Sequence, residues 1–216
     1  MPGMLGKPTK TGGPWDVHPG VAMVAKWVDE MPAKTGKSLD EWAETIRRKK
    51  FASQPEAAAW LKSEHAFGGN AASWVAQYTL ARNTWDGDPK LYLKQAASYV
   101  EKMFAGPKAG LKPLFDEVVA FARSLGADVC VCPCQTIVPF YRNQKFAELK
   151  PATKTRLELT LALGDTPFTG KMKLNPRAQG NDKLRHMFEL FEPKDFTTEA
   201  KKMLKKAYAI DGVKAG

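Results

Sequence analysis

The chain has 216 residues, a formal net charge of +10, 44% hydrophobic residues and 26% charged residues. This composition is typical of a globular protein, and the length suits one large domain or two small ones. No apolar run approaches the roughly 20 residues that a membrane span requires, which argues against a membrane protein. Residues 1–20 lack the apolar segment of a secretory signal, so we expect a cytoplasmic protein.

The excess of positive charge lies mainly in the second half of the chain. Residues 1–104 contain 14 Lys and Arg against 11 Asp and Glu, whereas residues 130–216 contain 16 against 9. A field of this sign attracts polyanions and acidic ligands over about a Debye length. A lysine-rich surface also keeps a protein in solution without binding anything, so both interpretations stay open.

The first part of the chain predicts an arm followed by a helical domain. Residues 1–19 are rich in Gly and Pro, and we expect them to form a flexible arm. From Val21 onward apolar residues recur at helical spacing, until Pro32 and Gly36 end the helix. The helical domain is expected over residues 20–105.

Local signals place the other helices of this domain. Ser-x-x-Glu capping boxes at 38–41 and 53–56 open two helices, Asn70 caps a third, and Asp88 starts a fourth. The Gly-Gly turn at 68–69 also resembles the phosphate-binding turn of a helix-hairpin-helix, although a plain turn between helices explains it equally well. All six tryptophans lie between Trp15 and Trp85, on apolar helix faces that we expect to form the bundle core.

The spacing of apolar residues changes from a helical period to the two-residue period of strands, which marks a second domain, expected over residues 106–216. Gly106–Gly110 is the predicted linker, and a helix from Leu111 to Leu125 is stopped by Gly126. Strands with a two-residue period follow, the clearest at 157–163. The other predicted strands lie at 129–132, 136–141, 146–149 and 186–191.

The end of the chain completes the predicted fold class. Residues 164–183 are expected to form a loop, Pro139 to lie at an edge or bulge, and Thr197 to cap a last helix. The predicted class is therefore α+β: an N-terminal helical bundle, then an α+β domain whose mainly antiparallel sheet is packed by flanking helices.

Two groups of motifs resemble known families. Thr35–Trp42, Ala59–His65 and the turn after them resemble a bacterial family of small helical domains with no assigned function. A second, uncharacterised family of α+β domains is similar at 140–142, 146–151, 157–161 and 206–208. The two families often occur fused in this order. The resemblance implies a two-domain protein, and it supplies no catalytic residues.

All three cysteines fall within five residues, at Cys130, Cys132 and Cys134. On a strand they would share one face, and three thiolates can bind a soft metal ion. The Cys-x-Cys spacing is not that of a zinc site, and no fourth ligand lies nearby in sequence. We therefore expect small, partly buried strand residues in a reducing compartment, and no metal.

A run of cations interleaved with aromatic residues is the strongest functional signal. Cations neutralise phosphates and aromatic rings stack on bases, so this composition indicates a nucleic-acid or other polyanion platform. A solvated surface above an aromatic core is the alternative. The predicted binding residues are Arg142, Lys145, Lys154, Arg156, Lys171, Lys173 and Arg185.

Catalytic signals are weaker. Asp128 with Glu148 and Lys150 is similar to the acid set of metal-dependent nucleases, but Glu-x-Lys is frequent by chance in a lysine-rich chain. No phosphate loop and no nucleophile pattern occurs, so we expect no cofactor and a binding protein rather than an enzyme. The predicted partner is nucleic acid or an acidic molecule. The alternative is a small-ligand domain with a pocket between the sheet and the C-terminal helix.

Overall fold

The computed structural model describes residues 6–81 and 87–212, and the contacts divide the chain into two units. The first unit contains residue 6 and, among those described, residues 19–81 and 87–92; the second contains residues 7–18 and 93–212. Each unit has its own buried core. Within these described ranges no helix is both long enough and apolar enough to cross a membrane.

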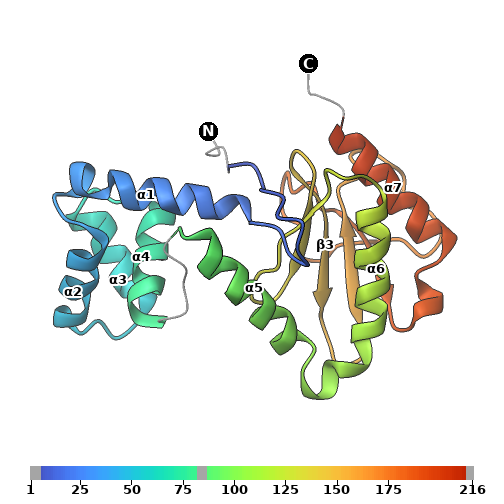
Figure 1. The fold of residues 1–216 in the computed structure, drawn as a ribbon, viewed down its shortest axis with the longest axis horizontal. Coiled ribbons are helices and arrows are strands. Elements are labelled where there is room, and N and C mark those ends of the chain that lie inside the picture. Colours follow the sequence, from blue (N-terminus) through green and yellow to red (C-terminus); the bar gives the residue numbers. More distant parts are fainter. Residues whose placement is uncertain (1–5, 82–86, 213–216) are drawn as a thin grey trace. The chain divides into compact units, whose positions relative to one another are not determined.

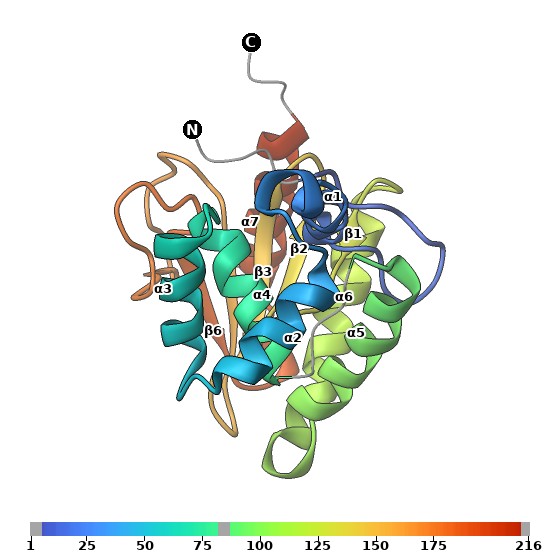
Figure 2. The same ribbon diagram turned by 90° about the vertical axis from the view of Figure 1, so that its left-hand side faces the viewer.

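The first unit is a bundle of helices. These are α1 (Pro19–Thr35), α2 (Leu39–Lys49), α3 (Gln54–Glu64), α4 (Gly69–Ala81) and the first residues of α5 (Pro89–Met103). Helix α4 packs against both α2 and α3, as Figures 1 and 2 show. The core contains Trp42, Ile46 and Leu61, and the Trp42 ring meets that of Phe67 edge-on. Four of the tryptophans therefore do line this bundle, namely Trp27, Trp42, Trp60 and Trp74.

Side-chain caps fix the starts of α2 and α3. The Ser38 hydroxyl accepts from the Glu41 amide, and the Glu41 carboxylate accepts from the Ser38 amide, which confirms a complete capping box. At α3 the Ser53 hydroxyl accepts from the Glu56 amide, but the Glu56 carboxylate accepts from the Ala52 amide instead. The second box is therefore only half formed.

Two expected helix limits differ from the structure. Pro32 does not end α1 but lies inside it, three residues before the helix ends at Thr35. Gly36, at φ +77°, follows the last helical residue and donates its amide to the Pro32 carbonyl. Asn70 does not cap α4 but lies within its first turn, since that helix begins at Gly69.

The second unit contains a six-stranded sheet with the order β1-β2-β3-β4-β6-β5, in which every neighbouring pair is antiparallel. This confirms the expected α+β class. The strands are β1 (Cys130–Val131), β2 (Val138–Tyr141), β3 (Lys145–Pro151), β4 (Leu157–Leu161), β5 (Lys173–Leu174) and β6 (His186–Leu190). The helical elements are the second half of α5, the 3-10 helices η1 (Gly106–Leu111) and η2 (Pro193–Asp195), α6 (Lys112–Ser124) and α7 (Thr198–Gly212).

One face of this sheet carries the core of the unit. Leu157, Leu159 and Leu161 of β4 are fully buried, and α6 and α7 lie on that side of the strands (Figure 1). Glu158 and Thr160 point to the opposite face, as a two-residue period requires. The alternation of faces follows the sequence, but Glu158 and Thr160 are also buried, so β4 is covered on both faces rather than half-buried as its alternating pattern predicts.

Three segments of the second unit differ from expectation. The predicted linker at Gly106–Gly110 is the 3-10 helix η1, which leads directly into α6. The predicted loop at 164–183 contains the short strand β5. Gly126 follows α6 without the left-handed backbone of a glycine cap, and a Cβ at this position would overlap the Tyr208 hydroxyl. A close approach of α7, rather than a cap, requires this glycine.

Pro139 lies in an inner strand rather than at an edge. It stands opposite Glu148, next to a register shift between Phe140 and Tyr141. Its carbonyl accepts from the Cys132 amide, so its missing N–H falls on the β1 side, beyond the end of that strand. The one ladder hydrogen bond that Pro139 cannot make is the return bond to the Cys132 carbonyl, just beyond the end of β1.

Residues 7–18, here named the N-terminal strap, extend the sheet beyond β1. The Asp16 amide donates to the Val131 carbonyl at 2.9 Å, and the Val131 amide donates to the Asp16 carboxylate at 2.8 Å. Trp15 lies against Phe115 in the core of this unit, not in the helical bundle. The strap (dark blue in Figure 1) thus differs from the flexible arm expected over residues 1–19.

Residues 1–5 of the arm and Trp85 lie outside the described residues. The contacts divide the units within α5, between residues 92 and 93, rather than at the predicted boundary after residue 105.

Candidate polyanion-binding site

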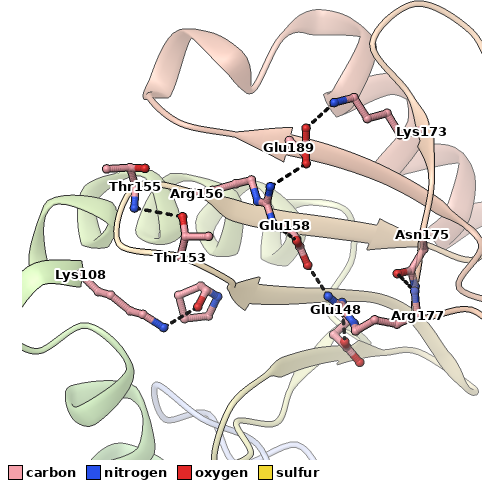
Figure 3. A network of polar contacts seen from close by, with 11 residues as sticks. Lys108, Glu148, Thr153, Thr155, Arg156, Glu158, Lys173, Asn175, Arg177 and Glu189 are labelled. Carbon is pink, nitrogen blue, oxygen red and sulfur yellow. Dashed lines mark hydrogen bonds and ion pairs between the residues drawn. The ribbon is translucent and has the colours of Figure 1, made fainter.

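The sheet face opposite α6 and α7 carries an ion network rather than an open row of cations (Figure 3). Glu158, only 3% exposed, accepts from Arg156 at 3.0 Å and from Arg177. Arg177 also lies 3.8 Å from Glu148, which is 7% exposed. Buried carboxylates are stable only when they are paired, so both arginines serve to neutralise this face.

The network continues to both sides of these residues. Glu189 accepts from Arg156 at 3.0 Å and from Lys173, and Lys145 pairs with Glu148 at 2.8 Å. Three of the predicted polyanion ligands, Lys145, Arg156 and Lys173, are therefore occupied by carboxylates of the same unit.

Two further predicted ligands also have partners. Arg142 donates to Asp128 at 2.6 Å, and its guanidinium lies 4.3 Å from the centre of the Tyr208 ring. Hydrogen bonds from Tyr208 and then Arg142 hold the pKa of Asp128 below its usual range. Lys171 is exposed and lies 3.7 Å from Asp195. The structure thus does not gather the predicted residues into one open basic face.

A groove at the C-terminal end of β3, by contrast, is lined by cations that are not paired with carboxylates of the described residues. It has a volume of about 480 Å³, and four lysines line it without any acidic residue. We name it the lysine groove, and its charged lining is Lys102, Lys108, Lys150 and Lys154. Within the described residues none of the four makes an ion pair, so their charges are not neutralised by the protein itself.

Four separate elements build the lysine groove. Lys102 stands in the last turn of α5, Lys108 in η1, Lys150 at the end of β3 and Lys154 in the turn after it. The Lys108 ammonium donates to the Pro151 carbonyl at 2.7 Å, which fixes η1 against the end of β3 (Figure 3). Gln135 and Thr136, between β1 and β2, add neutral polar groups to the lining.

Sequence reasoning found Lys154 but not the rest of this groove. Lys102 and Lys108 lie outside the basic run of residues 142–185, and η1 was predicted as a linker. Lys150 belongs to this basic run and to the possible nuclease set, but it is not one of the seven predicted binding residues. The remaining predicted residue, Arg185, lines a second groove near the start of β3, together with Lys145.

Within the described part of the chain, no three His, Cys, Asp or Glu side chains, the three cysteines included, gather closely enough to hold a metal ion. β1 ends at Val131, so Cys132 and Cys134 lie beyond the strand, although the Cys134 amide still donates to the Ile137 carbonyl at 2.8 Å. Burial raises the pKa of the Cys132 thiol far above its usual range and that of Cys134 to about 12. Both thiols are therefore protonated at neutral pH as long as no metal ion is bound.

The residues of the possible nuclease set have separate partners. Asp128 is held by Arg142 and Tyr208, whereas Glu148 accepts from Lys145. Lys150 lines the lysine groove instead. This arrangement lends no support to a shared divalent metal ion between the two carboxylates.

Comparison with known proteins finds family matches for both units. Residues 100–211, more than half of the chain, match a domain of unknown function (DUF5655). Residues 24–81 match another domain of unknown function (DUF4287). No curated protein and no solved structure matches the chain.

Proposed function

The chain belongs to the family of domains of unknown function DUF5655, and from its geometry we propose that it binds a phosphate-rich polyanion, nucleic acid in the first place, through the lysine groove. The observation that carries this proposal is a concave site with four lysines, no acidic lining and no internal ion pairs among the described residues. Four like charges held together favour an anion that neutralises several of them at once.

The lining indicates how such a ligand is held. Lysine ammonium groups bind phosphates as point charges and release condensed counterions from the polyanion. No aromatic side chain lines this groove, so it offers no platform for stacked bases. We therefore propose contacts to the phosphate backbone without sequence preference.

The same chemistry favours binding over catalysis. Among the described residues, no carboxylate, histidine or cysteine lines the lysine groove, so the lining offers none of the usual charged ligands of a catalytic metal ion. The three free cysteines suit a reducing compartment, and the cytoplasm stays the proposed location.

The salt dependence of binding tests the proposal. If all four lysines contact phosphates, the logarithm of the association constant for duplex DNA falls with the logarithm of salt at a slope of about −3.5. Affinity then drops roughly 100-fold between about 50 and about 200 mM salt. Fluorescence anisotropy with labelled duplex DNA, single-stranded DNA and RNA measures this, and heparin as a competitor distinguishes nucleic acid from polyanions in general.

A double variant measures how much the lysine groove contributes to this salt dependence. Lys150→Gln with Lys154→Gln is expected to reduce the slope by about 2, because two phosphate contacts are lost. Lys202→Gln is the control, since Lys202 is exposed on α7 and outside the groove. Absence of binding at low salt, or an equal slope for the double variant and the wild type, would refute the proposal.

A further inference from the structure

A second groove of the α+β unit has a volume of about 1010 Å³. It lies between the turn before β3, the segment after β4, the segment leading into β6 and the last turn of α7. We name it the aromatic groove, because Phe168 is one of its lining residues. The volume corresponds to the upper end of small-molecule sites in proteins.

Phe168 provides this groove with a flat apolar surface. The side chain is 46% exposed, which is unusual for phenylalanine. Its ring stacks on the buried His186 imidazole, with 4.5 Å between the ring centres and 25° between the planes. His186 is in turn held by a 2.7 Å hydrogen bond between its Nε2 and the Thr166 carbonyl. One face of Phe168 is thus supported, and the exposed remainder can stack on a planar ligand.

Several charges in the aromatic groove are already occupied. Asp182 accepts from the Leu184 amide at 2.9 Å, and Asp211 accepts from the amides of the turn before β3. Lys145 belongs to the ion network. These groups shape the groove but are not free for a ligand.

Three charged groups stay available to a ligand. Within the described residues, Arg185 and Asp165 have neither an ion pair nor a side-chain hydrogen bond. Lys183 bonds only to the neutral Gln144 side-chain oxygen, at 2.6 Å. The ring nitrogen Nδ1 of His186 is buried and has no hydrogen-bond partner among the described residues.

We propose that the aromatic groove binds a mononucleotide. The base stacks on Phe168, Arg185 and Lys183 bind the phosphate, and the Asp165 carboxylate accepts from the ribose hydroxyls. Each contact is a common one in proteins: aromatic side chains stack on bases, guanidinium groups bind phosphates, and carboxylates accept hydrogen bonds from the two ribose hydroxyls. This site is separate from the lysine groove, at the other end of β3, and does not depend on the polyanion proposal.

Titration of the full chain with AMP, with the heat of binding measured by calorimetry, tests this inference. Saturable binding with a Kd below about 1 mM is expected. Phe168→Ala should weaken it about 5- to 100-fold through the lost stacking. Arg185→Gln should weaken AMP about 10-fold while changing adenosine little, because adenosine lacks the phosphate. Ribose 5-phosphate should bind more weakly than AMP, because it lacks the base.

Matched variants separate this site from general charge effects. Lys154→Gln removes one positive charge from the lysine groove and should leave the Kd for AMP within about 2-fold. Circular dichroism confirms that each variant is folded. The inference is overturned by the absence of AMP binding, by unchanged affinity in Phe168→Ala, or by ribose 5-phosphate that binds as tightly as AMP. Failure of DNA binding leaves it standing, because Lys150 and Lys154 do not line the aromatic groove.

Discussion

Two side chains of the N-terminal strap hold it to the sheet by different chemistry. Asp16 is completely buried, and its carboxylate lies 3.4 Å from the Lys10 ammonium and 3.3 Å from the Arg123 guanidinium. It also accepts from the Val131 amide, so its charge is paired on several sides. His18 lies against Tyr141 of β2, with 2.9 Å between Nε2 and the hydroxyl oxygen. The strap is therefore fixed by one buried carboxyl group with basic partners and by one imidazole ring.

The pH dependence of stability is expected to report on His18. Burial, and secondarily the positive charge of Lys145, lower the pKa of His18 to about 4. The unfolded chain protonates this histidine near pH 6.5, so below that pH the unfolded state binds more protons than the folded state. Stability should therefore fall as the pH decreases from about 6.5 towards 4, by about 2 kcal/mol at pH 5.

Urea denaturation of the wild type and of His18→Gln at about pH 7 and pH 5 measures this effect. The variant keeps a polar side chain but cannot titrate, so the difference in free energy of unfolding between the two pH values should shrink by about 2 kcal/mol. If the variant lost as much stability between the two pH values as the wild type does, carboxylates rather than His18 would cause the pH dependence.

At the scale of elements, the sequence predicts structure wherever neighbours in the chain determine it. The capping box of α2 joins residues three apart in the chain, and the two faces of β4 alternate between consecutive residues. The strap, β5 and the grooves depend on contacts between distant segments. Asp16 bonds to Val131, and Arg177 reaches Glu158 from a later loop. Charge counting showed that cations were abundant, but not which of them carboxylates would neutralise.

Removal of the α2 cap tests the local part of this account. Ser38→Ala should lower the free energy of unfolding of the helical unit by about 1 kcal/mol, because the Glu41 amide loses its acceptor. Ser73→Ala is the control, since Ser73 is exposed within α4 and alanine is the better helix former. Thermal denaturation followed by circular dichroism measures both variants. Equal stability of Ser38→Ala and the wild type would show that α2 is held by its packing alone.

At the scale of the whole molecule, the α+β unit is discontinuous in the chain. It begins with the strap at residues 7–18, and the chain then forms the helical unit before it returns at residue 93. The family match begins only at residue 100, so the strap lies outside the recognised domain. β1 is at the end of the strand order and has only two residues, and such an edge needs a partner or a cover. The strap supplies this cover.

Deletion of residues 1–18 from the chain should therefore destabilise the α+β unit while leaving the helical unit folded. The Val131 amide loses its acceptor at Asp16, and its hydrogen exchange should become about 100-fold faster, as should exchange at neighbouring amides of β1. Amides of α2 to α4 serve as the internal control, because they belong to the other unit. A peptide of residues 7–18 added in trans should restore protection, whereas the same peptide with Asp16→Ala should not. Unchanged exchange at Val131 after the deletion would mean that β1 is stable without the strap, and that the recognised domain is complete in itself.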